Sequence, residues 1–239
     1  MEKYNRILLK LSGEALAGDK RFGIDLESLR AIAKAIKATE DLGVQVAIVV
    51  GGGNFWRGRD AGEMERTRAD HIGMLATVMN ALAVAENLEK LGSEVRVMTA
   101  FPIQNVAEPY IRNRAIRHLE KGRIVILACG TGNPFFSTDS ASALRAAEIG
   151  AEVVFKATLV DGVYDKDPHR YPDAKRYHTV TFSKVLADNL AVIDSTAASL
   201  CRDNNIPVYV FDLQSDPMNL VRAVQGEDIG TLIQEDIKE

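Results

Sequence analysis

Glycines, hydroxyls and a single carboxylate lie together in one short stretch of the chain, residues 130–140, which reads GTGNPFFSTDS. The apolar run 123–129 before it predicts a buried strand, and Ala141, Leu144 and Glu148 follow at helical spacing. The N-terminus of a helix therefore faces the loop, where unpaired N–H groups and the positive end of the helix dipole favour an anion such as phosphate. The same residues also suit a plain turn with a helix cap, so this segment alone leaves both interpretations open.

Two earlier strand ends also carry residues that suit phosphate. Lys10 ends the first apolar run and is followed by Ser12 and Gly13, which places a cation and a hydroxyl beside flexible backbone. Three successive glycines, residues 51–53, follow the second run, with Arg57 shortly beyond, and glycine exposes backbone N–H groups without a Cβ in the way. A solvated strand lysine and a tight strand-to-helix turn are the structural alternatives at these two places.

A fourth polar segment, residues 156–168, again comes just after an apolar run. Its lysine, threonine, tyrosine and late aspartates suit a base, a ribose and phosphates, whereas a polar turn with a β-hairpin explains the same residues structurally. Asp70 also has two interpretations, because it either caps a helix that begins near His71 or accepts hydrogen bonds from the hydroxyls of a ligand. Taken together, the segments place glycines or hydroxyls with a charge at several strand ends.

Several common kinds of site are excluded by the motifs. No G-x-x-x-x-G-K-[ST] occurs, and neither Gly51 nor Gly130 opens a G-x-G-x-x-G, so the P-loop kinase and Rossmann dehydrogenase interpretations fail. The four histidines lack ligand spacing, which argues against a structural metal and against histidine-based nucleophilic catalysis. Cys129 and Cys201 sit in apolar patterns without a CxxC and are expected to be reduced thiols of the core.

The elements that must position these segments alternate between strand and helix. Short runs rich in Val and Ile predict strands at 7–11, 44–50, 94–99, 124–129, 153–155 and 208–211. Amphipathic stripes between them predict helices, several of which we expect to be introduced by Asp25, Asp70 or Asp216 with Pro217. Strands that are apolar on both faces predict a mostly parallel sheet between two layers of helices, an α/β fold in which ligands bind beyond the carboxyl ends of the strands.

Composition sets the broad class of the protein. The 239 residues are 46% apolar and 26% charged, which is enough for one compact domain with a sizeable core. A net charge of −4 argues against a general nucleic-acid surface, so a basic site must be local, as in the cluster of Arg57, Arg59, Arg66 and Arg68. The apolar run near the start is too short for a signal peptide or a membrane span, and we expect a cytoplasmic protein.

At these segments the chain resembles the amino acid kinase superfamily, and in particular its bacterial uridylate kinases, which make UDP from UMP and ATP. The resemblance runs from Lys10 nearly to the C-terminus and rests on KLSGEAL at 10–16, GGGN at 51–54, DHIGMLAT at 70–77, GTGNPFFSTD at 130–139, DGVY at 161–164 and DP at 167–168. The segments 70–77 and 131–139 resemble the uridylate kinases specifically. The resemblance implies a single three-layer αβα domain over residues 1–239, with a mainly UMP-binding N-terminal part and a mainly ATP-binding C-terminal part.

The resemblance also implies which residues bind each nucleotide. ATP is expected at Lys10, Leu11, Ser12, Gly13, Gly53, Arg57, Thr158, Tyr164 and Asp167. UMP is expected at Gly52, Asp70, Thr131, Gly132, Asn133, Pro134, Phe135, Phe136, Ser137 and Thr138. The segment Gly18, Asp19, Lys20, Arg21, Phe22 and Gly23 aligns with a region that family members use for activation by GTP. The family further implies a homohexamer, often inhibited by UTP.

The chemistry expected of such a site is charge neutralisation. A nucleoside monophosphate already offers an anionic oxygen, so no general base is needed and the task is to bring two polyanions into line. We expect Lys10, the amides of Gly52 and Gly53, Arg57 and Mg²⁺ carried by ATP to stabilise the transferring phosphoryl group, with Asp139 orienting Lys10 or the water shell of the metal.

Two other functions use the same fold. A sibling kinase acting on a small carboxylate or carbamate shares the ATP half, but needs a pocket that recognises an amino acid rather than a base and ribose. A nucleotide sensor without catalysis tolerates the loss of Lys10 and Asp139, although both are present here.

Overall fold

The computed structural model describes residues 4–58, 62–166, 168, 170–171, 173–190 and 192–235. Within them, strands form one sheet in the order β4-β3-β5-β2-β1-β6-β8-β9-β7, in which β8 and β9 pair antiparallel and the other neighbours pair parallel. The strands are β1 (Arg6–Leu11), β2 (Gln45–Val50), β3 (Val95–Thr99), β4 (Glu108–Pro109), β5 (Ile124–Ala128), β6 (Val153–Thr158), β7 (Thr179–Val180), β8 (Val208–Asp212) and β9 (Gly230–Ile233).

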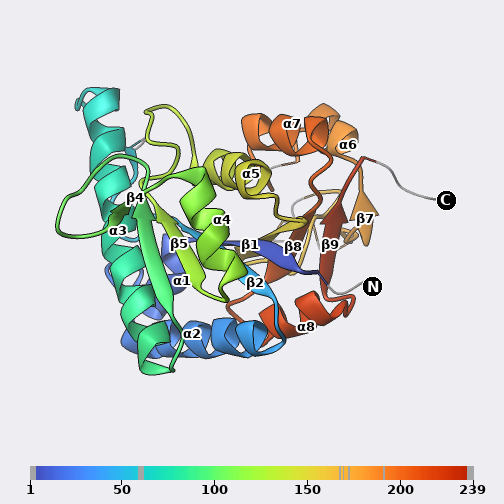
Figure 1. Ribbon diagram of the computed structural model, residues 1–239. Coiled ribbons are helices and arrows are strands. Elements are labelled where there is room, and N and C mark those ends of the chain that lie inside the picture. Colours follow the sequence, from blue (N-terminus) through green and yellow to red (C-terminus); the bar gives the residue numbers. More distant parts are fainter. Residues whose placement is uncertain are drawn as a thin grey trace.

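Helices cover both faces of this sheet, which gives three layers (Figure 1). On one face lie α1 (Gly13–Ala17), α2 (Leu26–Asp41), α3 (Arg66–Lys90) and α8 (Asn219–Gln225). On the other lie α4 (Arg112–Glu120), α5 (Thr138–Ile149), α6 (Phe182–Ala187) and α7 (Ser195–Asp203). The predicted three-layer α/β sandwich with a mostly parallel central sheet is therefore confirmed.

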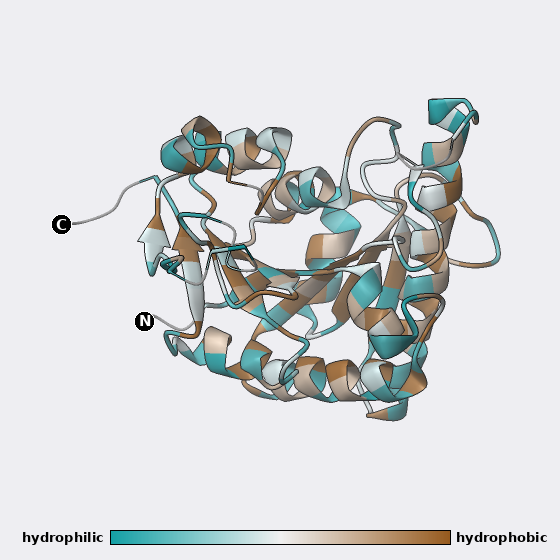
Figure 2. Cartoon of the chain, turned by 180° about the vertical axis from the view of Figure 1, so that it is seen from behind, coloured by the Kyte–Doolittle hydropathy of each residue, from teal (hydrophilic) through white to brown (hydrophobic). Residues whose placement is uncertain are grey.

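Strand alternation divides the core into two halves. Ile7 and Leu9 of β1 pack with the α2 and α3 side, whereas Leu8 packs with the α4 and α5 side. Figure 2 shows hydrophobic residues along the inner strands and a mixture of hydrophobic and hydrophilic residues on the outer helices. Because Lys10 has the same parity as Leu8, its side chain leaves the sheet on the α5 side, at the carboxyl end of β1.

Both cysteines are buried thiols without a disulfide partner, as the sequence predicted. Burial raises the pKa of Cys129 to about 11. Burial likewise raises the pKa of Cys201 to about 12, with Asp139 and Asp194 adding to the shift. Both side chains are therefore neutral at pH 7 and behave as small apolar groups of the core.

The predicted helix starts are correct at some places and wrong at others. Asp25 caps α2, because its carboxylate accepts a hydrogen bond from Ser28 N at 2.9 Å. Asp70 does not cap a helix: α3 begins at Arg66, and the Glu65 carboxylate accepts from the first free amides of that helix. The first turns of α3 are exposed and polar, so the apolar stripe used for the prediction starts later than the helix itself.

All six predicted strands are present, with small differences at their ends. The largest difference is at β6, which was expected to end at Phe155 and continues to Thr158. The short strands β4 and β7 and the antiparallel β9 were not predicted, because two to four residues carry too little alternation to recognise. Near the C-terminus, the helix α8 begins at Asn219, slightly after the expected start at Asp216 and Pro217.

Candidate active site

A cavity of about 630 Å³ lies beyond the carboxyl ends of β1, β2 and β5. Its wall includes residues from the N-terminal parts of α1, α3, α5 and α7, so several helix N-termini face the same space. Parallel strands and their crossover connections bring these segments together from distant parts of the sequence. The arrangement produces a polar cleft with many backbone N–H groups, which suits an anionic ligand.

Most of the predicted site residues line this cavity. Those brought together are Lys10, Ser12, Gly13, Gly52, Gly53, Arg57, Asp70, Thr131, Asn133, Phe135, Phe136, Ser137, Thr138 and Asp139. Residues of the same wall to which the sequence assigned no nucleotide-binding role include Glu14, Arg66, Thr77, Ser140 and Asp194. Four of them lie in the motifs or the arginine cluster described above, but only their proximity in the fold places them in the site.

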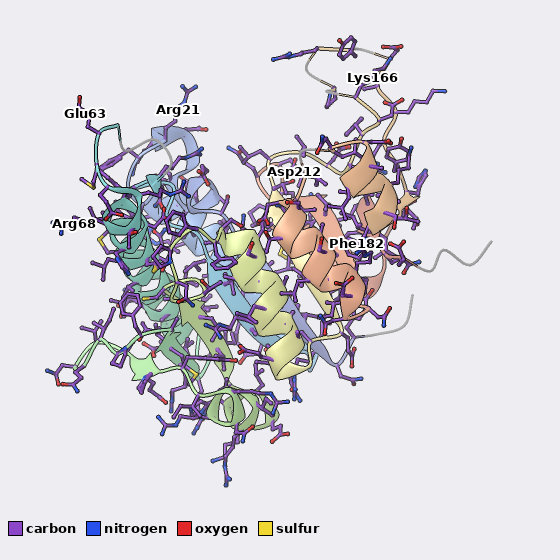
Figure 3. All side chains as sticks on the ribbon, turned by 90° about the horizontal axis from the view of Figure 1, so that it is seen from above. Arg21, Glu63, Arg68, Lys166, Phe182 and Asp212 are labelled. Atoms are coloured by element: carbon purple, nitrogen blue, oxygen red, sulfur yellow. The ribbon has the colours of Figure 1, made fainter. Side chains whose placement is uncertain are left out.

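The remaining predicted site residues lie elsewhere. Leu11 is fully buried in the core, and Gly132 and Pro134 belong to the loop without lining the cavity. Thr158 ends β6, and the Tyr164 hydroxyl donates to Asp161 Oδ1 at 2.7 Å outside the cavity wall. Figure 3 shows the segment that carries Lys166 standing away from the body of the molecule. Asp167 lies outside the described residues.

The centre of the site is a carboxylate between two lysines. Lys10 Nζ lies 3.1 Å from Asp139 Oδ1, and Lys156 Nζ donates to Asp139 Oδ2. Lys10 and Lys156 are paired neighbours on β1 and β6, so both ammonium groups emerge on the same face of the sheet, where α5 begins. Asp139 therefore contacts Lys10, which is compatible with one of the two roles that the sequence analysis expected for it.

Burial and charge act in opposite directions on this cluster. Burial favours a raised pKa for Asp139, but the attraction of Lys10 and Lys156 outweighs it and lowers the pKa below its usual value. Burial lowers the pKa of Lys156, and the nearby charge of Lys10 adds to this, although Asp139 opposes both. The carboxylate is thus held ionised at neutral pH as the fixed partner of two cations.

Lys156 is the main residue of the site that the site prediction omitted. The sequence placed it just after a strand that ended at Phe155, in the polar segment 156–168 whose side chains suit a nucleotide, without assigning it a partner in the site. Because β6 continues to Thr158, Lys156 instead alternates onto the face that Lys10 occupies and is only 8% exposed. A longer strand in the prediction would have revealed the pair.

The glycines at the end of β2 allow a very close approach of backbone segments. A Cβ on Gly52 would lie 2.7 Å from Gly73 O and 3.0 Å from Ala76 Cβ, both in α3. A Cβ on Gly13 would lie 2.8 Å from Gly53 N. Among the described residues, the N–H groups of Gly52 and Gly53 donate to no acceptor, so two amides remain available to a ligand beside Lys10.

The loop 130–137 closes the opposite wall of the cavity. Its backbone is left-handed at Gly130, Gly132 and Phe135, with φ of 57°, 83° and 72°. Ser137 caps α5 by accepting from Asp139 N at 3.0 Å and from Ser140 N at 3.1 Å. The helix that was expected to face this loop is therefore present, with its capped end at the cavity.

Asp194 fastens the end of this loop to α7. Its Oδ1 accepts from Ser140 Oγ at 3.0 Å and from Ala197 N at 2.9 Å, while Ser137 Oγ donates to Oδ2. One carboxylate thus caps α7 and holds the hydroxyl that caps α5. The sequence gave no signal for this contact, because it joins residues more than fifty positions apart.

Asp70 projects from α3 toward the cavity, as its ligand-binding interpretation required. Arg66 Nε donates to both carboxylate oxygens at 2.9 Å, and Phe135 N donates to Oδ2 at 2.8 Å. The Arg66 guanidinium also lies 5.8 Å from the centre of the Phe135 ring. The aspartate therefore links α3 to the loop on the opposite wall.

Arg57 forms an ion pair with Glu14 at the edge of the same cavity. The arginine side chain is 53% exposed, so the cation is free to reach toward a ligand without crossing the core. Glu14 lies in the first turn of α1, and a Cβ on Gly53 would collide with its carboxylate. The glycine run thus leaves room for the acidic partner as well as for a ligand.

The segment 18–23 lies outside the cavity wall but contacts the glycine run. Gly23 N donates to Asn54 O at 3.0 Å, and Asn54 Nδ2 donates back to Gly23 O at 2.6 Å. Phe22 is 69% exposed, and its ring centre lies 5.8 Å from that of Phe55. Arg21 projects outward at the edge of the molecule in Figure 3.

The described residues contain neither a cluster of metal ligands nor a membrane-spanning helix. No group of three or more histidine, cysteine, aspartate or glutamate side chains is arranged to hold a metal ion there. Nor does that part of the chain contain a helix with the length and apolar character needed to cross a membrane.

Comparison with known proteins gives a consistent result. Residues 5–212 match the model of the Amino acid kinase family. A UMP kinase of Bacillus anthracis is 42% identical, covers 99% of this chain with 98% of its own length, and superposes with a TM-score of 0.95. A UMP kinase of Ureaplasma parvum is 36% identical, with 98% of this chain and 100% of that chain covered and a TM-score of 0.92. A uridylate kinase of Archaeoglobus fulgidus is 30% identical, with 97% of this chain and 100% of that chain covered and a TM-score of 0.73. With its parallel sheet, its glycine-lined cleft and these similarities, the chain belongs to the amino acid kinase family and groups within it with the UMP kinases.

Proposed function

We propose that this protein transfers the terminal phosphoryl group of ATP to UMP and releases UDP and ADP. The observation that carries the proposal is the cluster of Lys10, Asp139 and Lys156 beside the free amides of Gly52 and Gly53. Lys10, Asp139 and the two glycines line one cavity, Lys156 contacts Asp139 from the buried side, and the full length of the chain is similar to UMP kinases. Cations and free amides at one point are what a transferring phosphoryl group requires.

The reaction needs no general base in this proposal. The phosphate of UMP supplies an anionic oxygen, which attacks the terminal phosphorus of ATP while the bond to the bridging oxygen of ADP breaks. Lys10 and the two glycine amides take up the charge on the transferring group, and Asp139, itself held by Lys156, keeps Lys10 in place. Fixed donors act more strongly here than in water because they need no reorganisation during the step.

Mg²⁺ enters this scheme as part of the ATP substrate. Asp139 is already engaged by two lysines, and Asp194 accepts hydrogen bonds from Ser137, Ser140 and the α7 backbone. These carboxylates are therefore poorly suited to act as direct metal ligands. We assign the ion to the phosphates and their water shell, where it lowers the repulsion between the two nucleotides.

The UMP side of the site is assigned to Gly52, Asp70 and the loop 131–138. Asp70 offers carboxylate oxygens suited to ribose hydroxyls, and the loop offers backbone groups and the exposed rings of Phe135 and Phe136. The ring exposures of 67% and 51% leave aromatic surface available to a base. A pocket for a small amino acid has no use for such surface.

The ATP side is assigned to Lys10 through Gly13, Gly53 and Arg57 for the phosphates. Thr158, Tyr164 and Asp167 are assigned to the nucleoside end of ATP. The position of Thr158 at the carboxyl end of β6, next to the strand of Lys10, supports this direction for the ligand. The nucleoside end of ATP is thus assigned to the C-terminal part of the chain, as the resemblance implied, whereas the ATP phosphates are assigned to its N-terminal part.

Assembly and regulation complete the proposal. We assign the chain to a cytoplasmic homohexamer that GTP activates and UTP inhibits, with GTP acting near residues 18–23. The exposed apolar side chains of Leu75, Met79 and Leu82 on α3 support assembly, because they offer a surface for another subunit. The hydrogen bonds between Gly23 and Asn54 support a path from residues 18–23 to the glycine run.

A substrate panel tests the proposal. ADP release from ATP and Mg²⁺ is measured with UMP, CMP, dUMP, acetylglutamate, aspartate and carbamate, each with and without GTP. Turnover with UMP, well above that with the other acceptors, is the expected result. Turnover only with a small acid would keep the fold and replace the substrate, and silence with all acceptors would favour a nucleotide sensor.

A further inference from the structure

Arg145 of α5 is a buried cation outside the cavity wall. It is only 6% exposed, and a guanidinium is stable at such a place only if its charge and its donors are matched. Its NH1 donates to Glu148 Oε2 at 2.6 Å, and its carbon centre lies 4.1 Å from the middle of the Tyr110 ring. The guanidinium is thus held between a carboxylate and an aromatic face.

The second terminal nitrogen of Arg145, NH2, points at the start of the loop 130–137. NH2 lies 3.4 Å from Gly130 O and 3.5 Å from Thr131 O, long contacts that a charged donor nevertheless strengthens. Arg145 therefore connects α5 to the first two carbonyls of the loop. No motif in the sequence pointed to this connection, and the reaction scheme above does not use it.

Tyr110 fixes the carboxylate that holds Arg145. Its hydroxyl donates to Glu148 Oε2 at 2.8 Å. Burial, followed by this contact with Glu148, raises the pKa of Tyr110, so the phenol keeps its proton and remains a donor. Tyr110 also supplies the ring against which the guanidinium lies, so one residue sets both the position and the plane of Arg145.

The turn that Arg145 holds is otherwise unfavourable. Cys129 has a φ of 65°, a left-handed conformation that is costly for a residue with a Cβ, and Gly130 and Gly132 are left-handed as well. Gly132 N donates to Cys129 O at 2.9 Å and closes the turn. Such a turn persists only when its surroundings hold it, and Arg145 contacts it from the side of α5.

Peptide geometry makes this contact relevant to ligand binding. In a trans peptide the C=O and the following N–H point in opposite directions. Because Gly130 O faces Arg145, the N–H of Thr131 must face away from α5. Gly130 and Thr131 both line the cavity. Thr131 N donates to no acceptor among the described residues, so it is a free donor aimed by a contact on the other side of the backbone.

We infer that Arg145 is a positioning residue that, held by Tyr110 and Glu148, orients the first peptides of the loop 130–137 and thereby sets the affinity for the acceptor nucleotide. This inference rests on the assignment of that loop to UMP. Lysine does not replace arginine here, because a single ammonium does not reach the carboxylate and the two carbonyls while lying flat on the ring. The bound ATP phosphates, assigned to the other wall, do not depend on Arg145.

Steady-state kinetics of Arg145→Lys, Tyr110→Phe and Arg112→Lys test the inference. Arg112 is the matched control, since it is an exposed arginine that donates to Glu148 O and does not contact the loop. Arg145→Lys is expected to raise the KM for UMP about tenfold, the effect of losing a hydrogen bond to a charged donor, with the KM for ATP within twofold of the parent. Tyr110→Phe is expected to change the KM for UMP in the same direction by less, and Arg112→Lys to change neither.

Hydrogen exchange of the ligand-free protein provides a second readout that does not depend on the reaction. The amide of Gly132 is expected to exchange faster in Arg145→Lys and in Tyr110→Phe than in the parent or in Arg112→Lys. Parallel increases of both KM values, or an unchanged KM for UMP with unchanged exchange, would overturn the inference. If Arg145→Lys does not fold, Tyr110→Phe carries the same comparison. If the parent does not phosphorylate UMP, the proposed function fails, and the exchange result still decides whether Arg145 holds the loop.

Discussion

Every lysine or arginine that lines the cavity lies beside a carboxylate in the described structure. The pairs are Lys10 with Asp139, Arg57 with Glu14, and Arg66 with Asp70. Such partners hold long side chains in place before a ligand arrives, and they limit repulsion between cations that stand close together. In the proposed reaction the incoming phosphates compete with Glu14 and Asp70 for their arginines, whereas the buried Asp139 remains with its lysines. The exposed pairs are thus the adaptable part of the site, and the buried cluster is the fixed part.

Substitution of Lys10 tests the fixed part. Lys10→Ala removes one donor from the transferring phosphoryl group, and the expected loss in kcat is about 10²–10³-fold, as for other preorganised donors. Lys37→Ala is the control, because Lys37 pairs with Asp41 on the outer surface of α2. Steady-state assays under saturating nucleotides measure the effect. A Lys10→Ala enzyme with near-normal turnover would remove Lys10 from the reaction.

Substitution of Asp139 tests the electrostatics of the cluster. Because the two lysines lower the folded-state pKa of Asp139, its stabilising effect is present above the ordinary aspartate pKa of about 3.9 and is lost as the pH falls through the lower folded value. Asp139→Asn leaves Lys156 buried without its anion, which is expected to cost about 3–5 kcal/mol in the free energy of unfolding at pH 7.

Urea denaturation at pH 7 and at pH 3 measures this difference. The difference in the free energy of unfolding between Asp139→Asn and the parent is expected to be smaller at pH 3 than at pH 7. Asp41→Asn serves as control, since Asp41 is 61% exposed and an exposed pair contributes about 0–1 kcal/mol. An equal gap at both values of pH would contradict the account.

Residues in local motifs were predictable, and residues defined by distant contacts were not. Residue type and position at a strand end were enough to predict Lys10, Gly52 and Gly53. Lys156 needed the true length of β6, and Asp194 needed the packing of α7 against α5. The sequence carries these relations only through the fold, so a reading of neighbouring residues does not reveal them.

At the scale of elements, β2 and α3 are joined by a buried pair of asparagines. Asn80 Nδ2 donates to Asn54 Oδ1 at 2.7 Å and also lies 2.7 Å from Gly51 O, while Asn54 Nδ2 donates back to Asn80 Oδ1 at 3.0 Å. The bonds hold the glycine run against the helix that carries Asp70. The two walls of the proposed nucleotide site are thereby placed relative to each other.

Removal of this link is expected to be costly. Asn80→Ala leaves Gly51 O and Asn54 Oδ1 without a donor in a buried place, at a cost of about 1–3 kcal/mol in the free energy of unfolding, whereas Asn54 Nδ2 keeps its bond to Gly23 O. Asn87→Ala is the matched control on the same helix, since Asn87 only donates to Ala83 O within α3. Urea denaturation compares the two variants. Equal stabilities would show that the asparagine pair does not join these elements.

The sequence predicted the central elements better than the outer ones. Apolar runs identified β1, β2, β3, β5, β6 and β8, because strands buried on both faces are continuous in their hydrophobicity. The edge strands β4 and β7 have two residues each and owe their existence to their neighbours. The start of α3 was missed for a related reason, since its first turns form a polar rim around the cavity rather than an amphipathic stripe.

At the scale of the molecule, one sheet carries both proposed nucleotide sites along its carboxyl edge. The strands β5 and β2 lead toward the loop 130–137 and Gly52 on the proposed UMP side, β1 leads toward residues assigned to the ATP phosphates, and β6 leads toward the proposed nucleoside end of ATP. The two sites meet where Lys10 on β1 stands next to Lys156 on β6. The point of phosphoryl transfer thus coincides with the boundary between the two halves of the sheet.

The proposed assembly gives a prediction at the same scale. Sedimentation or light scattering is expected to give a particle of about six times the 26.1 kDa chain. Met79→Glu, which places a charge among the exposed apolar residues of α3, is expected to lower this mass, and Lys34→Glu on exposed α2 surface is not. A monomer for the parent protein would contradict the proposed hexamer and leave the reaction untouched.

The transfer itself is the most direct test of the central claim. ATP labelled at its terminal phosphate is incubated with Mg²⁺, UMP and the protein, and the products are separated. The account predicts that the label appears in the terminal phosphate of UDP and that Lys10→Ala suppresses it. Label released only as inorganic phosphate, with UMP recovered unchanged, would contradict phosphoryl transfer to UMP.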